Sequence, residues 1–135
     1  MEAAHSVQFR IVKHLITFPV YVNDEGPFDF WLDTGGPVLI IKKSLAEELG
    51  LDVIDTGKKG IGAGGEVPVL LTTVNSLSFA GIKFKEVQAH VLDLKGMDEK
   101  FGIKFYGCIG YDLLKNFKVC IDYVNQKLTL VKLTS

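Results

Sequence analysis

Alternating apolar and polar positions dominate this chain and predict a protein built mainly from β-strands. The two-residue period of half-buried strands covers residues 6–13, 67–79 and 82–92. The last two of these segments are separated only by Ala80-Gly81, which is typical of a tight hairpin turn. The pattern therefore predicts a long hairpin in the middle of the chain.

A second hairpin is predicted near the N-terminus. Residues 15–23 and 28–33 are rich in β-forming side chains, and the turn-forming cluster at 23–27 lies between them. The second strand of this hairpin ends at Asp33. A closing hairpin is predicted from 118–124 and 127–133, around Asn125-Gln126.

Two short helices complete the predicted elements. Ser44 and Glu47 form a capping box, and Gly50 suits the end of the same helix. Asp112 is a candidate N-cap for a second helix. We expect a mobile turn or loop at 57–66, where five of ten residues are glycine, and a polar surface loop at 95–106. Together, these elements predict a single all-β domain spanning 1–135.

Composition excludes several classes of function. The 135 residues fit one domain, and the values of 47% hydrophobic and 23% charged are ordinary for a globular protein. The net charge of −1 gives no reason to expect a nucleic acid or an anionic membrane as partner. No apolar run reaches the roughly 18 residues that a membrane span needs.

The cysteines and histidines do not predict a metal or cofactor site. Cys108 and Cys120 form no Cys-x-x-Cys motif, and the three histidines are far apart in the sequence. Both cysteines lie in strand-like apolar runs, where buried free thiols are commoner than disulfides, although one disulfide stays open. We expect no nucleophilic role for Cys108, because no histidine is placed by sequence to activate it.

The most informative polar residue is Asp33, which lies in Asp33-Thr34-Gly35-Gly36 between two apolar runs. An unpaired carboxylate costs several kcal/mol to bury, so it needs hydrogen-bond donors or a partner. Adjacent glycines allow another backbone or a ligand to approach closely. Asp33 is either the cap of a turn, bonded to the following N–H groups, or a poorly solvated acid–base group.

The tripeptide alone does not decide between these interpretations, because Asp55-Thr56-Gly57 repeats it. Lysines follow this second copy, not an apolar run, so we expect an exposed structural turn there. The two copies are 22 residues apart, which is too close for an internal duplication that would bring their carboxylates face to face.

The order of motifs resembles that of retropepsin-like aspartic proteases, particularly the bacterial and archaeal single-lobe type. Asp33-Thr34-Gly35, the apolar run at 38–41 and the helix ending in Leu49-Gly50-Leu51 resemble the family's active-site segment. The glycine-rich stretch at 61–65 resembles its flap, and Ile109-Gly110 with the following residues resembles its second signature. The resemblance covers about residues 15–131.

This resemblance implies a retropepsin-like acid protease fold, a closed barrel-like lobe with one or two short helices. It also implies a homodimer that cleaves peptide or unfolded protein substrates, because two carboxylates must share a proton and each chain offers one. Asp33 would be catalytic, and Thr34 and Gly35 would support the active site.

The remaining implied site residues contact substrate or underlie the site. Residues of the flap would be Ile61, Gly62, Ala63, Gly64 and Gly65. Trp31, Ile109 and Gly110 are assigned to a substrate pocket or the base of the site, with core or dimer packing as the alternative for Trp31. The resemblance implies no cofactor and no metal.

Two departures from the family pattern keep a second function open. Gly36 stands where alanine is usual, and Pro37 replaces the usual serine, whose hydroxyl often bonds the catalytic carboxylate. The alternative is therefore a catalytically weak or inactive dimer that binds peptides or serves in assembly. An unrelated small β-barrel is the third interpretation. The missing leader-like segment and sparse cysteines favour a cytoplasmic location, with export as the alternative if a leader has been removed.

Overall fold

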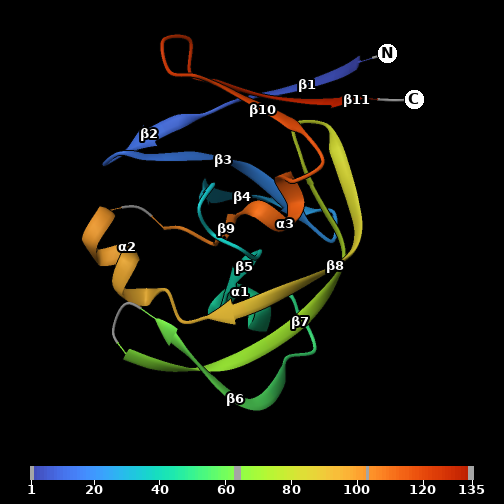
Figure 1. The fold of residues 1–135 in the computed structure, drawn as a ribbon. Helices are drawn as coiled ribbons and strands as arrows, with labels where there is room; N and C mark the ends of the chain where they lie inside the picture. Colours follow the sequence, from blue (N-terminus) through green and yellow to red (C-terminus); the bar gives the residue numbers. More distant parts are fainter. Residues whose placement is uncertain (1, 63–64, 103, 134–135) are drawn as a thin grey trace.

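The computed structural model describes residues 2–62, 65–102 and 104–133, which form a mainly β-structure with three short helices (Figure 1). The strands are β1 (Glu2–Gln8), β2 (Arg10–Val12), β3 (Leu15–Val22), β4 (Glu25–Leu32), β5 (Ile40–Lys42), β6 (Ile54–Gly62), β7 (Gly65–Phe79), β8 (Ile82–Leu92), β9 (Gly107–Ile109), β10 (Lys118–Asp122) and β11 (Lys127–Leu133). The helices are α1 (Lys43–Glu48), α2 (Lys95–Phe101) and α3 (Tyr111–Leu114).

Eight strands form one sheet that curves back on itself. Their order is β2-β3-β4-β9-β5-β8-β7-β6, and β3 also pairs with β7 through Tyr21–Ser78 and Val22–Leu77. This extra pairing turns the strands into a ring (Figure 1), although the ring is not formally a barrel. The predicted all-β fold is confirmed, and the described part of the chain contains three short helices instead of one or two.

Three strands that are not in sequence order, β4, β9 and β5, lie side by side at the centre of this sheet. The short strand β9 lies between β4, to which it is parallel, and β5, to which it is antiparallel. Strands β4 and β5 are consecutive in sequence, so the loop that connects them must pass over the end of β9. That loop contains Asp33.

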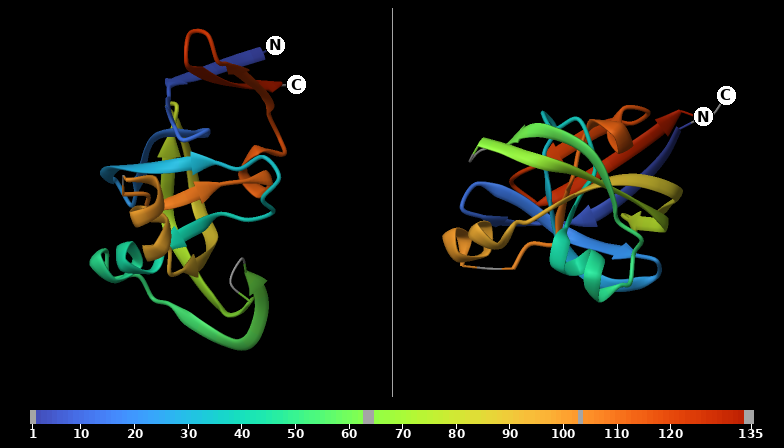
Figure 2. Two further views of the ribbon diagram at one scale, coloured as in Figure 1. Left: turned by 90° about the vertical axis from the view of Figure 1, so that its left-hand side faces the viewer. Right: turned by 90° about the horizontal axis from the view of Figure 1, so that it is seen from below.

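The chain ends form a separate sheet of three strands in the order β1-β11-β10. All seven residues of β1 pair with β11 in antiparallel register, and both views of Figure 2 show the two strands side by side. Phe9 interrupts the strand that the sequence predicts at 6–13. Its side chain is buried and its N–H donates to the carbonyl of Gln126, so β1 and β2 belong to different sheets.

The main hydrophobic core fills the ring. Phe18 and Phe30, on β3 and β4, are almost fully buried there, and β5, α1 and β11 contribute Ile41, Leu45 and Leu130. A full side chain of this size contributes about 1.5–3 kcal/mol when it is removed from water. Burial on both β4 and β5 therefore fixes the two strands that carry the ends of the Asp33 loop.

Two predicted loops are regular structure instead. Most of the glycine-rich segment at 57–66 belongs to the hairpin of β6 and β7. Glycine still has a backbone N–H and carbonyl, so it can form strand hydrogen bonds where a neighbouring strand supplies partners. The polar segment at 95–106 begins with α2, which ends at Gly102 in the left-handed conformation with φ of 70°. Glycine at that position is a helix stop signal that composition alone obscured.

No helix within the described ranges 2–62, 65–102 and 104–133 is long and apolar enough to cross a membrane.

Candidate functional site

The loop at 33–39 begins where β4 leaves the core. Residues 30–32 of β4 are buried, Asp33 is half-buried, and Thr34 and Gly35 are exposed. The N–H of Gly36 donates to the backbone carbonyl of Asp33 at 3.0 Å, which closes a tight turn. The turn-cap interpretation predicts that the Asp33 carboxylate accepts this hydrogen bond, but the backbone carbonyl accepts it instead.

Three hydrogen bonds tie this loop to the junction of β9 and α3. The Asp33 N–H donates to the carbonyl of Ile109 at 2.9 Å, and the Tyr111 N–H donates to the carbonyl of Gly36 at 2.8 Å. The Leu39 N–H donates to Oδ2 of Asp112 at 3.0 Å. The start, middle and end of the loop are each fixed, so the Asp33 carboxylate is carried on a preorganised backbone.

Two glycines pack closely at the same junction, Gly110 against backbone and Gly36 against the Asp33 side chain. A Cβ on Gly110 would lie 2.5 Å from the carbonyl oxygen of Gly36. A Cβ on Gly36 would lie 2.8 Å from Oδ2 of Asp33. Glycine at Gly36 therefore leaves space for the carboxylate in its present position, which gives one physical reason for the departure from the alanine usual in the resembling family.

Asp112 does not cap α3 as predicted. Gly110 occupies the N-cap position, and no side chain caps the helix there. The carboxylate of Asp112 instead reaches back to Leu39, and its Oδ1 is buried without a hydrogen-bond partner among the described residues. A link to the Asp33 loop is invisible in the sequence because 73 residues separate Leu39 from Asp112.

Beneath the loop, a second small core contains Trp31, whereas Ile109, also predicted for the pocket or base of the site, belongs to the main core. Trp31, Leu94, Phe105 and Cys108 pack together, with the rings of Trp31 and Phe105 in an edge-to-face arrangement at 5.7 Å. Trp31 is 9% exposed, so it is mainly a packing residue. Burial, and then the nearby Asp33 carboxylate, raises the pKa of Cys108 to about 12. The thiol is therefore neutral at ordinary pH and is not activated as a nucleophile.

Both cysteines are free thiols, so the disulfide alternative is not supported. Cys108 is buried as expected, whereas the expectation is wrong for Cys120. Cys120 lies on β10, which pairs on one side with β11 and carries exposed residues at alternate positions. An alternating strand does not reveal which face points outward until its packing is known.

The predicted flap is the end of the β6–β7 hairpin. Ile61 pairs with Glu66 and Gly62 pairs with Gly65, while Ala63 and Gly64 lie outside the described residues. Ile61 is 92% exposed, an unusual value for a large apolar side chain. A backbone hydrogen bond joins Asp33 to Ile109, and Gly110 packs against Gly36 of the same loop, whereas no hydrogen bond between described residues joins the hairpin to this loop.

The second Asp-Thr-Gly sequence is structural. Asp55, Thr56 and Gly57 lie in β6, where the pairing with β7 shifts register. Oδ1 of Asp55 accepts a hydrogen bond from the N–H of Gly57 at 2.9 Å, and Gly57 has a left-handed φ of 74°. The exposed turn predicted here is a bulge within a strand, and Asp55 is exposed.

A buried ion pair, which the sequence did not suggest, holds α2 against β5. The ammonium group of Lys42 pairs with Oδ2 of Asp98, while Oδ1 of Asp98 accepts a hydrogen bond from the N–H of Phe105 at 3.1 Å. The Lys42 side chain is only 5% exposed. This pair ties the segment after β8 to the core beneath Asp33.

The described residues contain no cluster of three or more histidine, cysteine, aspartate or glutamate side chains that could hold a metal ion. A cavity of about 470 Å³ opens between the segment after α1 and the strands β7 and β8. None of its lining residues belongs to the Asp33 loop, so it is separate from the candidate site.

Comparison with known proteins identifies the family of this chain. A family model described as aspartyl protease matches residues 18–113. Among solved structures, a retropepsin-like aspartic protease from Rickettsia conorii is similar, with a TM-score of 0.69 and 25% sequence identity. The alignment covers 98% of this chain and 92% of that one. The comparison with curated proteins gave no match.

Proposed function

The chain belongs to the retropepsin-like aspartyl protease family, and on that premise we propose that it is a homodimeric aspartic endopeptidase in which Asp33 is the catalytic residue. The observation that carries the proposal is the anchoring of the Asp33 backbone at the end of β4 by the β9–α3 junction. A carboxylate on a rigid loop, beside exposed Thr34 and Gly35, is suited to meet a second copy of itself.

The proposed chemistry requires two carboxylates that share one proton, because like charges about 3 Å apart cannot both ionise. The ionised Asp33 takes a proton from a water molecule as that water attacks the peptide carbonyl carbon. The protonated Asp33 of the other subunit gives its proton to the carbonyl oxygen. The first Asp33 then gives the proton that it took from water to the amide nitrogen, and the C–N bond breaks as a hydroxyl proton of the tetrahedral intermediate passes to the second Asp33, which restores the pair of carboxyl groups.

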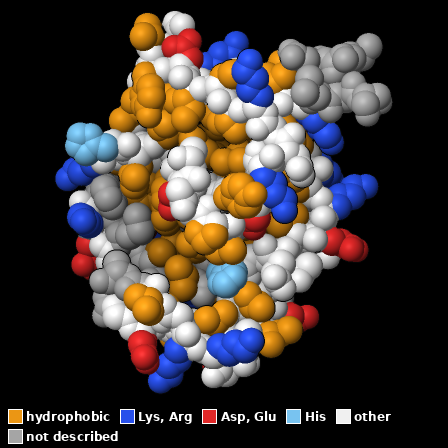
Figure 3. All heavy atoms as spheres, viewed as in Figure 1, with side chains coloured by type: hydrophobic (Ala, Val, Ile, Leu, Met, Phe, Trp, Pro, Cys, Tyr) orange, Lys and Arg blue, Asp and Glu red, His pale blue; other side chains and the backbone are white. Residues whose placement is uncertain are grey.

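Exposed apolar side chains support a surface that another molecule covers. Ile11 on β2, Ile61 on the β6–β7 hairpin and Tyr111 beside Gly110 are 43%, 92% and 60% exposed. Figure 3 shows apolar side chains extending over β2 and β3 toward the middle of one face, with most charged side chains at its margin. Such a distribution favours association with a second subunit or an extended peptide.

The β6–β7 hairpin has a proposed role in substrate binding. Its backbone could add hydrogen bonds to an extended peptide in the manner of an additional strand, while Ile61 and the flap glycines lie over the bound chain. In this proposal Gly35 offers its carbonyl to the substrate backbone and Thr34 bonds across the dimer axis.

The chain contains its own matched control for testing this proposal. Asp33→Asn should abolish cleavage of an unfolded protein at pH about 4–6, where one shared proton is expected. Asp55→Asn alters the same tripeptide in a structural bulge and should leave cleavage unchanged. Retention of activity by Asp33→Asn would contradict the proposal. A wild-type dimer without cleavage at any pH, yet with peptide affinity, would favour the alternative of a binding or assembly module.

A further inference from the structure

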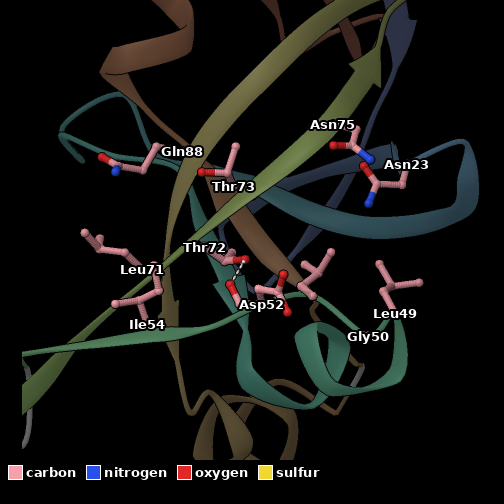
Figure 4. A pocket seen from close by; sticks show the side chains of 11 residues that line it. Asn23, Leu49, Gly50, Asp52, Ile54, Leu71, Thr72, Thr73, Asn75 and Gln88 are labelled. Atoms are coloured by element: carbon pink, nitrogen blue, oxygen red, sulfur yellow. Dashed lines mark hydrogen bonds between the residues drawn. The ribbon is translucent and has the colours of Figure 1, made fainter.

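The cavity between α1 and the β7–β8 hairpin has features of a binding site that is independent of Asp33. Its volume of about 470 Å³ lies in the range of roughly 300–1,000 Å³ found for small-molecule sites. Figure 4 shows that its walls come from several parts of the chain. The lining residues are Asn23, Leu49, Gly50, Leu51, Asp52, Ile54, Leu71, Thr72, Thr73, Asn75 and Gln88.

The charge of this cavity has one sign. Asp52 is the only ionisable residue among those lining it. Its backbone carbonyl accepts a hydrogen bond from Oγ1 of Thr72 at 2.8 Å, which fixes the residue against β7. The Asp52 carboxylate makes no ion pair or hydrogen bond with the described part of the chain. The Asp52 side chain is exposed at the cavity, and a carboxylate without a partner attracts a cation.

The opposite wall supplies neutral acceptors. Thr73 and Gln88 are register partners on β7 and β8, and Asn75 lies two residues along β7, so all three project from the same face of the hairpin. Each side chain is exposed, and none bonds to another described residue. Figure 4 shows these three above the cavity and Asp52 below it. Hydroxyl and amide oxygens can accept hydrogen bonds from the same cation.

Four aliphatic side chains form the apolar part of the lining. Leu49, Leu51 and Leu71 are half-buried, and Ile54 is 64% exposed. These side chains can cover a hydrocarbon stem but cannot hydrogen-bond to it. A site with one carboxylate, several amide or hydroxyl acceptors and aliphatic walls suits an amphipathic cation, in which methylene groups pack and a charged end is solvated by oxygen atoms.

We propose that this cavity binds a guanidinium or primary ammonium group carried on an aliphatic chain, with Asp52 as its counter-ion. The group is either a free small molecule or the arginine or lysine side chain of a polypeptide. Ile54 and Leu71 are register partners at the base of the β6–β7 hairpin, so the bound stem would contact both strands there. The proposal does not depend on proteolytic activity.

The test is a titration of the 135-residue chain with n-butylguanidinium and with its neutral isostere n-butylurea, and binding is monitored by two-dimensional amide NMR. The cation should shift signals of Asp52, Ile54, Leu71 and Gln88 saturably, and n-butylurea should bind at least about fivefold more weakly. Raising the salt concentration should weaken the binding of n-butylguanidinium but not that of n-butylurea. Equal affinity for the two compounds, or shifts confined to other parts of the protein, would overturn the proposal.

Variants separate the role of Asp52 from general charge. Asp52→Asn should weaken the binding of n-butylguanidinium about fivefold. Asp55→Asn removes a nearby carboxylate that does not line the cavity, so it should leave this affinity unchanged. Gln88→Leu provides a second variant on the opposite wall and should also weaken the binding of n-butylguanidinium. Unchanged affinity in both Asp52→Asn and Gln88→Leu, with folding verified by the same spectra, would refute the assignment.

A peptide distinguishes the two sources of the cation. A capped, otherwise uncharged pentapeptide with one central arginine is compared with the same peptide carrying citrulline. Tighter binding of the arginine peptide than of n-butylguanidinium identifies a polypeptide side chain as the ligand, and the reverse order identifies a free small molecule. If neither the arginine peptide nor n-butylguanidinium binds in preference to its neutral partner, the site is not a cation site.

Discussion

The substitution Gly110→Ala tests how the Asp33 loop is held in place. Gly110 has φ of −130° and ψ of −160°, an extended conformation open to any residue. The loss of stability in Gly110→Ala therefore arises from steric contact and not from backbone strain. The added Cβ would lie 2.5 Å from the Gly36 oxygen and 3.2 Å from that of Val38. Relief requires the loop at 33–39 to move away from α3.

The expected loss of stability follows from two terms. Overpacking of a well-packed position typically costs about 1–3 kcal/mol. Displacement of Gly36 also lengthens its 2.8 Å bond to the N–H of Tyr111, which contributes about 1 kcal/mol. The free energy of unfolding should therefore fall by about 2–4 kcal/mol, which lowers the urea midpoint by roughly 1–2 M.

Equilibrium urea unfolding and cleavage of an unfolded protein are the assays. Gly96→Ala is the matched control, because a Cβ there meets nothing within 4 Å and alanine favours the α2 helix by about 0.5 kcal/mol. Cleavage by Gly110→Ala should fall further than its folded fraction, since Asp33 is displaced. A midpoint within error of wild type, with full activity, would refute the argument that the β9–α3 junction positions Asp33.

Two further predictions concern the core beneath the loop. Asp98→Ala leaves the buried ammonium of Lys42 without its partner and should lower the free energy of unfolding by about 2–3 kcal/mol, whereas Asp29→Ala, which breaks an exposed pair, should cost under about 1 kcal/mol in the same urea assay. Because the pKa of Cys108 is raised to about 12, the unfolded chain loses the thiol proton first as pH rises above about 9, and the free energy of unfolding should fall across this window. Cys108→Ala should reduce this dependence of the free energy of unfolding on pH, and Cys120→Ala should not. Equal pH dependence in both cysteine variants would contradict the assignment to Cys108. Equal losses of stability in the two aspartate variants would contradict the assignment of a buried ion pair.

Much of the fold was accessible from local sequence patterns. The hairpin that delivers Asp33 and the long hairpin joined at Ala80-Gly81 are both present, because period-two patterns and turn residues act over short distances. The first helix is also present at 43–48, close to its predicted position, but the predicted capping box is wrong, because Lys42 occupies the N-cap position and no side chain caps the helix. The ordered motifs likewise indicated the family, since their sequence of occurrence constrains the topology more than any one motif does.

The contacts that build the candidate site were not accessible in the same way. Asp112 bonds Leu39 across 73 positions, and Lys42 meets Asp98 across 56 positions. No local pattern encodes such pairs, because they depend on β9 lying between β4 and β5. The glycine-rich strand at 54–62 was similarly misassigned, since the partner strand β7, and not intrinsic propensity, makes it a strand.

The central claim is that two copies of Asp33, one from each subunit, form a single catalytic centre. Cleavage of an unfolded protein by mixtures of wild-type and Asp33→Asn chains, refolded together at constant total concentration, tests this claim most directly. If both carboxylates are required, activity should fall as the square of the wild-type fraction, to about one quarter in an equal mixture. A linear fall, to about one half, would mean that each chain acts alone and would contradict the account.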